Sequence, residues 1–240
     1  RIAQAIDRVL AAQNGSGGFG LWGADWDGDL WLDAYVSDFL SRARAEGYAV
    51  PQRALAAALD RLQNAVNAAP DFDRDANEGG AALAYALMVL AREGTARIGD
   101  LRYYADAKGA DFGTPLAMAQ LGAALALYGE QARADAMFRR AGALLADRTA
   151  MTEDHRWRSD YGTDRRDAAG VLALAAEAGS QAVDRAPLHA ALTADPGRLS
   201  PQEAAWQLLA AHALIEGGQG AGFTVNGEPA EGPLVRAVED

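Results

Sequence analysis

The sequence predicts an all-α protein of stacked helical hairpins, and three observations lead to that prediction. Half of the residues are hydrophobic and alanine supplies much of that half; alanine favours helices because it loses no side-chain entropy in them. Apolar residues recur at three- and four-residue spacing almost throughout the chain. Each periodic run ends at a glycine, which can take the left-handed conformation that closes a helix; these glycines are Gly47, Gly94, Gly129, Gly179 and Gly217.

Start signals complement these helix ends. Thr114 precedes Pro115, which places a capping side chain before a proline at the first helical position. Ser200 precedes a second such proline, and Glu203 is spaced to bond back to the backbone of Ser200. Many helices with short links imply stacked hairpins, which either run open as a solenoid or close into a toroid. The expected helices cover 1–12, 30–46, 52–67, 78–93, 98–107, 114–128, 130–147, 164–178, 185–193 and 201–216.

The C-terminal tail has a different pattern. Residues 222–234 alternate apolar residues around Asn226-Gly227, which is the strongest short hairpin signal. We therefore expect a helical domain over 1–219 and, over 220–240, the start of a flanking β module or a linker with a short strand or hairpin. The chain begins at Arg1, without Met, inside a predicted helix, so we expect it to be a piece of a longer protein.

Composition excludes several functions. The net charge of −11 would repel phosphate backbones and anionic lipid, so we expect no nucleic-acid partner and no membrane contact by this segment. No apolar run approaches the ~20 residues of a membrane span. The chain has no cysteine, which excludes disulfides, Cys-ligated zinc and a Cys nucleophile within it.

The stretch from Gln13 to Tyr35 holds three of the five tryptophans and four aspartates. We expect the Gln13 amide to bond backbone groups at a helix end, covered by the aromatic residue that follows the glycines. The alternative is a tryptophan platform for a sugar or an apolar ligand. Asp25, Asp27 and Asp29 could hold Ca²⁺, but the EF-hand spacing is not met; we favour Asp29 as the cap of the next helix.

Other chemistry-bearing residues give weaker signals. His155, His189 and His212 have no metal-ligand spacing, and we interpret His212 as a hydrogen-bonded core residue. No nucleophile elbow or phosphate loop is present. Residues 157–167 alternate charge around two aromatics, which fits either a carboxylate-recognising site or a turn held by Arg–Asp pairs; we favour the turn. We predict no catalytic residue, no metal and no cofactor.

Several stretches together resemble the thioester-containing domain of bacterial alpha-2-macroglobulins. Residues 13–23, QNGSGGFGLWG, match a helix that ends in Gln before a GGF turn, and residues 29–51 match the family's W-L-x-A-Y helix and its G-Y-x-V-P turn. The resemblance covers nearly the whole chain, because further matches lie at 84–106, 114–138, 161–169 and 199–214, and in the tail, which is similar to the first strand of the family's flanking β domain.

The resemblance implies an α/α toroid, the closed form of the hairpin stack. Members are protease inhibitors of the bacterial periplasm, serve in host defence and are often lipid-anchored to the inner membrane. A protease cuts a bait segment, a buried Cys–Gln thioester becomes exposed, and an amine of the protease is captured covalently. The expected partners are therefore proteases and other domains of the same longer chain. The resemblance makes five residues framework residues near a thioester pocket: Gln13, Phe19, Trp22, Trp31 and Tyr35.

The chain also departs from the family. The thioester motif Cys-x-Glu-Gln is absent, so this chain holds no thioester; the motif would lie upstream of Arg1, or the protein belongs to a branch that lacks it. Asp33 replaces the Thr common in W-L-T-A-Y. Complement relatives carry an assisting His shortly before a Gly-Gly, and the nearest match, residues 71–80, has none. No catalytic residue is carried over.

Two enzyme classes with a helical toroid are the alternatives. The Q-x-x-x-G-G-F turn at Gln13 is similar to the repeat motif of terpene cyclases and prenyltransferases, but their D-x-D-D and D-D-x-x-D motifs are absent. A glycan-active toroid would need two carboxylates facing each other across a cleft, and the sequence offers no way to pair its many acids. We therefore predict a domain that is not an enzyme.

Overall fold

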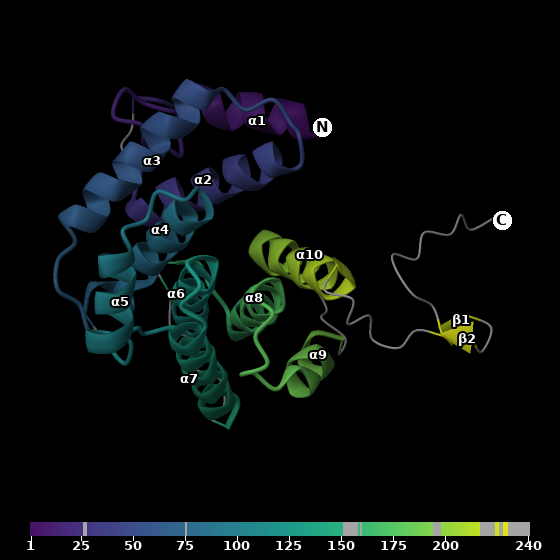
Figure 1. Ribbon diagram of the computed structural model, residues 1–240. Coiled ribbons are helices and arrows are strands. Elements are labelled where there is room, and N and C mark those ends of the chain that lie inside the picture. The colour runs from purple at the N-terminus through teal and green to yellow at the C-terminus, as the bar shows by residue number, and fades with distance from the viewer. Residues whose placement is uncertain are drawn as a thin grey trace.

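The computed structural model describes residues 1–25, 28–74, 76–150, 158, 160–193, 198–216, 224–225 and 228–229. Its helical elements follow the predicted order (Figure 1). They are α1 Ile2–Ala11, α2 Leu30–Ala45, α3 Gln52–Asn67, the 3-10 turn η1 Asn77–Gly80, α4 Ala81–Arg92, α5 Ile98–Ala107, α6 Pro115–Leu127, α7 Gln131–Ala150, α8 Asp164–Glu177, α9 Arg185–Thr193 and α10 Pro201–Glu216.

The helices alternate between an inner and an outer row. Helices α2, α4, α6, α8 and α10 pack against one another in succession, and α1, α3, α5, α7 and α9 pack outside them (Figure 1). The inner helices begin at one end of the molecule. There the Gly113 N–H donates to the Gly79 carbonyl at 2.9 Å, and the Thr163 hydroxyl donates to Glu203 at 2.7 Å. We call this end the N-terminal face; it comprises the residues at and just before Leu30, Ala81, Pro115, Asp164 and Pro201.

Two contacts bring α2 back to α8 across the inner row. At the N-terminal face, the ring of Trp31 lies 5.9 Å from that of Tyr161, measured between centroids. At the opposite end, Arg42 Nη1 lies 2.9 Å from Glu177 Oε1. Because α2 and α8 meet at both ends, the row curves back on itself. The predicted all-α fold, an α/α toroid of stacked hairpins, is confirmed.

The centre of the toroid is packed mainly with apolar side chains. Every residue of α6 from Pro115 to Leu125 is buried, as is every residue of α4 from Leu83 to Ala91. A helix that is buried all round belongs to the interior of a protein. Alanine supplies four of the eleven residues in the α6 segment and three of the nine in the α4 segment, which helps the helices to approach closely. Gly122 of α6 faces the ring of Phe138 on α7.

Most helix boundaries agree with prediction within one residue, and two do not. Helix α7 ends at Ala150, three residues later than expected. Helix α4 begins at Ala81, three residues later than expected, because Glu78, Gly79 and Gly80 have φ values of 59°, 57° and 66°. Left-handed backbone cannot continue a right-handed helix. The predicted helix-ending glycines have positive φ where they are described, at Gly47, Gly94, Gly129 and Gly179; Gly217 lies outside the described residues.

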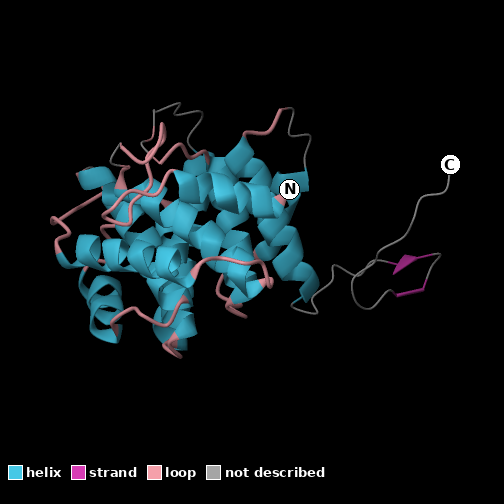
Figure 2. Cartoon of the chain, turned by 90° about the horizontal axis from the view of Figure 1, so that it is seen from above, coloured by secondary structure: helices cyan, strands magenta, loops and turns pink. Residues whose placement is uncertain are grey.

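The tail contains strands β1 Thr224–Val225 and β2 Glu228–Pro229, an antiparallel pair of two residues each. The Asn226-Gly227 turn lies outside the described residues, and the flanking β module stays a prediction. All other regular structure in the described residues is helical (Figure 2). Within that part of the chain, no helix combines the length and apolarity that crossing a bilayer requires.

Candidate functional site

Capping side chains define the starts of the inner helices at the N-terminal face. Asp29 accepts the Leu32 N–H at 2.7 Å and so caps α2, as predicted. The Thr114 hydroxyl accepts the Ala117 N–H at 3.1 Å, with Pro115 at the first position of α6, again as predicted. Each cap satisfies a backbone donor that the helix itself leaves unpaired. The segments before the helices are thereby held against the toroid.

The glycine-rich turn after α1 is tied down by Gln13. Its Nε2 donates to the carbonyls of Gly17 at 3.1 Å and Ala54 at 2.9 Å, which joins the end of α1 to α3. Phe19 pairs with Gln13 in an isolated antiparallel bridge and is 2% exposed. This geometry agrees with the prediction that the Gln13 amide bonds backbone groups at a helix end and that an aromatic residue covers them.

Asp33 connects this turn to α2, a role that the sequence did not reveal. It is 1% exposed, its Oδ1 accepts the Phe19 N–H at 2.7 Å, and its Oδ2 lies 3.2 Å from Arg61 Nε. Burial raises the pKa of Asp33, although the Phe19 N–H and Arg61 act in the opposite direction. A Cβ at Gly28 would lie 1.9 Å from the Phe19 carbonyl oxygen. The turn therefore needs both this glycine and the carboxylate.

Four aromatic residues form a cluster beside this turn, which we call the aromatic cluster: Trp31, Tyr35, Tyr85 and Tyr161. Trp31 stacks on Tyr35 at 5.1 Å, and Tyr85 meets both rings edge-on. Trp31 is 7% exposed, whereas Tyr161 is 55% exposed at the rim. Burial raises the pKa of Tyr85 well above its ordinary value, and its hydroxyl donates to Asp38 at 3.1 Å. The centre of the cluster is therefore buried, since Trp31 and Tyr85 are 7% and 2% exposed.

The five residues predicted as framework are only partly brought together. Trp31 and Tyr35 are neighbours in the aromatic cluster. Gln13 and Phe19 lie in the adjoining turn, which Asp33 joins to α2. Trp22 is 82% exposed and makes no ring contact among the described residues. Tyr85 and Tyr161 were not predicted, because only the folded chain brings α4 and the start of α8 next to α2.

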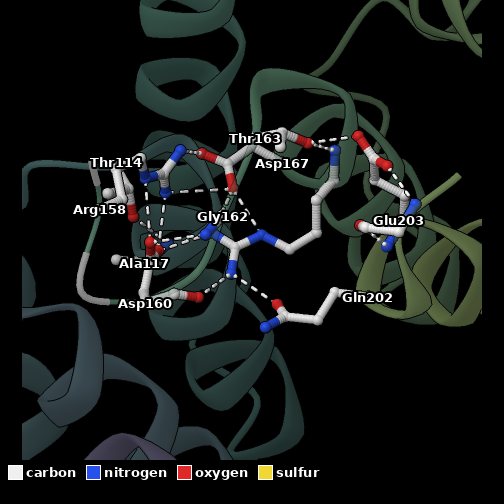
Figure 3. A network of polar contacts seen from close by, with 11 residues as sticks. Thr114, Ala117, Arg158, Asp160, Gly162, Thr163, Asp167, Gln202 and Glu203 are labelled. Carbon is white, nitrogen blue, oxygen red and sulfur yellow. Dashed lines mark hydrogen bonds and ion pairs between the residues drawn. The ribbon is translucent and has the colours of Figure 1, made fainter. Parts of the chain in front are cut away.

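A buried ionic network holds the segment that carries Tyr161 (Figure 3). Arg166 Nη2 lies 2.6 Å from Asp160 Oδ2 and 2.6 Å from Asp167 Oδ1. Arg158 pairs with the same two carboxylates at 2.7 and 2.9 Å. Arg166 Nη1 also donates to Gln202 of α10 at 3.1 Å. The prediction of a turn held by Arg–Asp pairs is confirmed over the described residues of 157–167; Trp157 lies outside them.

Charge pairing keeps Asp160 ionised. Burial alone would raise the pKa of Asp160, but the guanidinium groups of Arg166 and Arg158 lower it below its ordinary value. Two guanidinium groups face two carboxylates, which compensates their loss of water. Because Arg158 and Arg166 are paired within the chain, the alternative of an external carboxylate ligand gains no support.

The network continues to the start of α10 through the predicted capping box. The Ser200 N–H donates to Glu203 Oε2 at 2.7 Å, and the Glu203 N–H donates to Ser200 Oγ at 3.3 Å. Glu203 Oε1 also accepts the Thr163 hydroxyl, and Thr163 caps α8 by accepting the Arg166 N–H at 3.0 Å. One carboxylate therefore links the first turns of two neighbouring inner helices.

Backbone strain is concentrated on the same face. Within the described residues, Glu78 and Tyr161 are the two non-glycine residues with positive φ, at 59° and 51°. Each stands shortly before an inner helix. Strained residues persist where the surroundings hold them, and they are common at functional sites. At Gly79, a Cβ would lie 2.6 Å from the Gly113 Cα, so two backbones meet here without room for a side chain.

Known proteins with a similar sequence identify the family of this chain. No family model matches the chain. Over 178 residues, 72% of its length, it is 36% identical to the alpha-2-macroglobulin of Escherichia coli strain K12. The chain belongs to the bacterial alpha-2-macroglobulin family. It spans 10% of the length of that curated relative.

Solved macroglobulin structures share the fold. The native E. coli protein from domain MG7 to the C-terminus matches with a TM-score of 0.76 and 33% identity, over 89% of this chain and 34% of that one. Salmonella alpha-2-macroglobulin reacted with methylamine matches with a TM-score of 0.72 and 33% identity, over 86% of this chain and 14% of that one. Trypsin-activated E. coli alpha-2-macroglobulin matches with a TM-score of 0.73 and 33% identity, over 88% of this chain and 14% of that one. The chain is thus a helical domain of macroglobulin type.

Metal binding has no support in the described part of this macroglobulin domain. No group of three or more His, Asp or Glu side chains there is placed to hold an ion. Asp29 is used as a cap, Asp25 is exposed, and Asp27 lies outside the described residues. His212, predicted in the core, is exposed, so that prediction is wrong; α10 buries Trp206, Ala210 and Ala213 on its other side. His189 is also exposed, and His155 lies outside the described residues.

A small cavity of about 320 Å³ lies between the α3–α4 segment and α5 and shares no lining residue with the aromatic cluster. It contains a single carboxylate, Asp71, whose Oδ1 lies 2.6 Å from Lys108 Nζ. A glycan-cleaving site needs two carboxylates roughly 5–10 Å apart. This macroglobulin domain does not offer that pair in the cavity, which is lined by Ala69, Pro70, Asp71, Phe72, Tyr103, Tyr104 and Lys108.

Proposed function

We propose that this segment is the non-catalytic helical domain of a bacterial protease-trapping macroglobulin. Its role is to shelter, at the N-terminal face, a thioester that an upstream part of the same longer chain supplies. The observation that carries the proposal is the aromatic cluster, because it lies on this face in a chain of the macroglobulin family. A solved relative that reacted with methylamine supports the presence of an electrophile in the longer protein. A solved relative that was activated by trypsin supports a protease as its target.

The geometry suits shielding. A thioester reacts with amines and with water, so it lasts only where water is excluded until activation. Trp31 and Tyr35 offer stacked apolar rings, and the ionic network fixes Tyr161 at the rim. The capping side chains and the Gln13 turn hold the surrounding backbone. The domain contributes a dry, rigid wall and no reacting group.

The longer protein would act in the periplasm, with a lipid anchor to the inner membrane. Its partners would be proteases, which it captures, and the other domains of its own chain. The measurement is direct. Methylamine should release one free thiol per molecule of the longer protein, and trypsin should form a covalent adduct that survives denaturing electrophoresis. A protein that yields neither would refute the proposal.

The shielding role of the aromatic cluster has a separate test. In the longer protein, Tyr161→Ala should raise spontaneous thiol release by roughly ten-fold, because it opens the rim above Trp31. Trp22→Ala is the matched control, since Trp22 is 82% exposed outside the cluster, and it should leave the rate unchanged. Equal rates of thiol release in the two variants would show that the aromatic cluster does not shield the thioester.

A further inference from the structure

The chain uses its basic side chains very unequally. It contains 21 arginines and one lysine, Lys108, and it has no cysteine. Free amines and thiolates are the side chains that attack acyl carbons most readily. An arginine guanidinium stays protonated at any physiological pH and does not attack. Within the part of the chain that the structure describes, the ion pairs are accordingly made with arginine, apart from those of Lys108.

Lys108 lies at the end of the molecule where a thioester would be sheltered. It follows directly after α5, an outer helix that ends where the inner helix α6 begins. Its Nζ lies 5.5 Å from the centroid of the Phe72 ring. That ring fills the space at Gly80, the residue before α4, where a Cβ would meet it at 2.6 Å. One aromatic ring thus separates Lys108 from the N-terminal face.

All three protons of the Lys108 ammonium group are engaged. Nζ lies 2.6 Å from Asp71 Oδ1 and 3.1 Å from Asp111 Oδ2, and it donates to the Phe72 carbonyl at 3.2 Å. The side chain is 18% exposed. An ammonium group can donate three hydrogen bonds and has no lone pair. Acceptors on three sides therefore hold Lys108 in its non-nucleophilic form.

The electrostatic surroundings of Lys108 point the same way. Hydrogen bonds that the Lys108 ammonium group donates to Asp71 and Asp111 raise the pKa of Lys108 from 10.5 to about 12. Near neutral pH this shift further depletes the free amine, which is already the minor form of an ordinary lysine. The pKa shift is upward because the two carboxylates stabilise the protonated amine, so the nucleophilic free amine is depleted.

We propose that this domain is kept free of reactive amines and thiols, so that the thioester reacts with a lysine of the captured protease and not with an amine of its own shelter. The inference rests on the proposed function. In the reaction that is avoided, an amine nitrogen forms an amide bond to the acyl carbon, the C–S bond breaks with its electron pair on sulfur, and the amine proton ends on the thiolate. Arginine provides charge without this reaction, and Asp71 and Asp111 mask the one amine that remains.

The masking of Lys108 can be tested without any thioester. The purified protein is acetylated with an N-hydroxysuccinimide ester of acetic acid at pH 8, and modification is followed by mass spectrometry. Lys108 should react at least ten-fold more slowly than the lysine introduced by Arg53→Lys on the exposed surface of α3. The double variant Asp71→Asn, Asp111→Asn should bring Lys108 close to that control rate. Equal rates for both lysines in the otherwise unchanged protein would overturn the masking.

The exclusion of lysine is tested in the longer protein with two charge-preserving substitutions. Arg198→Lys adds an amine just before α10, at the N-terminal face, and Arg53→Lys adds one at the opposite end, where α3 begins. After activation with trypsin, Arg198→Lys should form an internal amide, visible as a cross-linked peptide, and should capture several-fold less protease. Arg53→Lys should capture as before.

The outcomes separate this inference from the proposed function. A longer protein in which methylamine releases no thiol refutes the proposed function and the inference with it. A protein that does release the thiol, yet captures protease equally well with Arg198→Lys and with Arg53→Lys, refutes the inference alone. In that case the scarcity of lysine reflects composition and has no chemical role.

Discussion

Two buried carboxylates of the candidate site are held in opposite electrostatic situations. Asp33 has one ion-pair partner, Arg61, whose side chain is 35% exposed, and its pKa is raised by burial. Asp160 is enclosed by Arg158 and Arg166, which outweigh its burial and lower its pKa. Asp33 is therefore a residue whose charge the fold tolerates, whereas the charge of Asp160 is one on which the fold depends.

The two carboxylates should respond to pH with opposite signs. For Asp33 the folded state binds the proton more tightly than the unfolded chain, so its contribution to the free energy of unfolding falls as pH rises from 3.8 through the raised pKa. Asp33→Asn should thus gain stability relative to the natural protein over that rise. For Asp160 the contribution is lost as pH falls from 3.8 through the lowered pKa. Urea unfolding at several pH values measures both; parallel pH profiles would contradict the assignment.

Removal of one charge from the ionic network should be costly. Asp160→Asn keeps the shape of the side chain but leaves Arg158 and Arg166 short of a buried anion, with an expected loss of about 3 kcal/mol in the free energy of unfolding. The control is Asp106→Asn, which removes a surface pair with Arg133 and should change little. Chemical denaturation compares them at neutral pH. Similar losses would mean that the network does not work as a buried unit.

At the scale of the element, the starts of the inner helices carry the proposed function. Their caps, their left-handed residues and their links all lie on the N-terminal face, so each helix start is also a part of the proposed shelter. The 3-10 turn before α4 shows this coupling most clearly. Gly79 has a φ of 57°, and the Gly113 N–H donates to its carbonyl. Two loops that precede different inner helices are thereby fixed in one position.

Gly79→Ala should therefore destabilise the fold more than a glycine change at an ordinary helix end. The added methyl group would lie 2.6 Å from the Gly113 Cα and would also sit on left-handed backbone, so we expect a loss of about 2–3 kcal/mol. Gly94→Ala is the control, because its φ is 71° but no atom lies within 4 Å of the added group; its loss should be about 1 kcal/mol. Equal losses would show that backbone conformation alone matters at Gly79.

Sequence reasoning was accurate wherever the signal was local. Thr114-Pro115, the Ser200–Glu203 box and the helix-ending glycines predicted boundaries because caps and left-handed glycines act within a few residues. The start of α4 was misjudged because Glu78 takes a conformation that only its tertiary surroundings enforce. Asp33 was noticed as a departure, but its partner Arg61 lies on another helix. The aromatic cluster needed three separate segments to meet, and no local pattern encodes that meeting.

At the scale of the whole molecule, closure distinguishes this toroid from an open stack. In an open stack each hairpin contacts only its neighbours, so the terminal pairs can open alone. Here α2 reaches α8 at both ends, through Trp31 and Tyr161 and through Arg42 and Glu177. Glu177 also pairs with Arg92 of α4 at 3.2 Å. One carboxylate therefore joins three inner helices at the end opposite the proposed shelter.

Glu177→Gln should loosen this closure without unfolding the domain. It removes the anion shared by Arg42 and Arg92, two partly exposed cations, which we expect to lower the free energy of local opening by roughly 1 kcal/mol. Amide hydrogen exchange in α1 to α3 should then rise about five-fold while exchange in α6 and α7 stays the same.

The control is Glu130→Gln, because Glu130 likewise bridges two arginines, Arg102 and Arg133, but both lie on outer helices. That variant should leave α1 to α3 unchanged, since the link that it removes does not cross the ring. If both variants raise exchange in the same segments, the Arg42–Glu177 contact does not close the toroid.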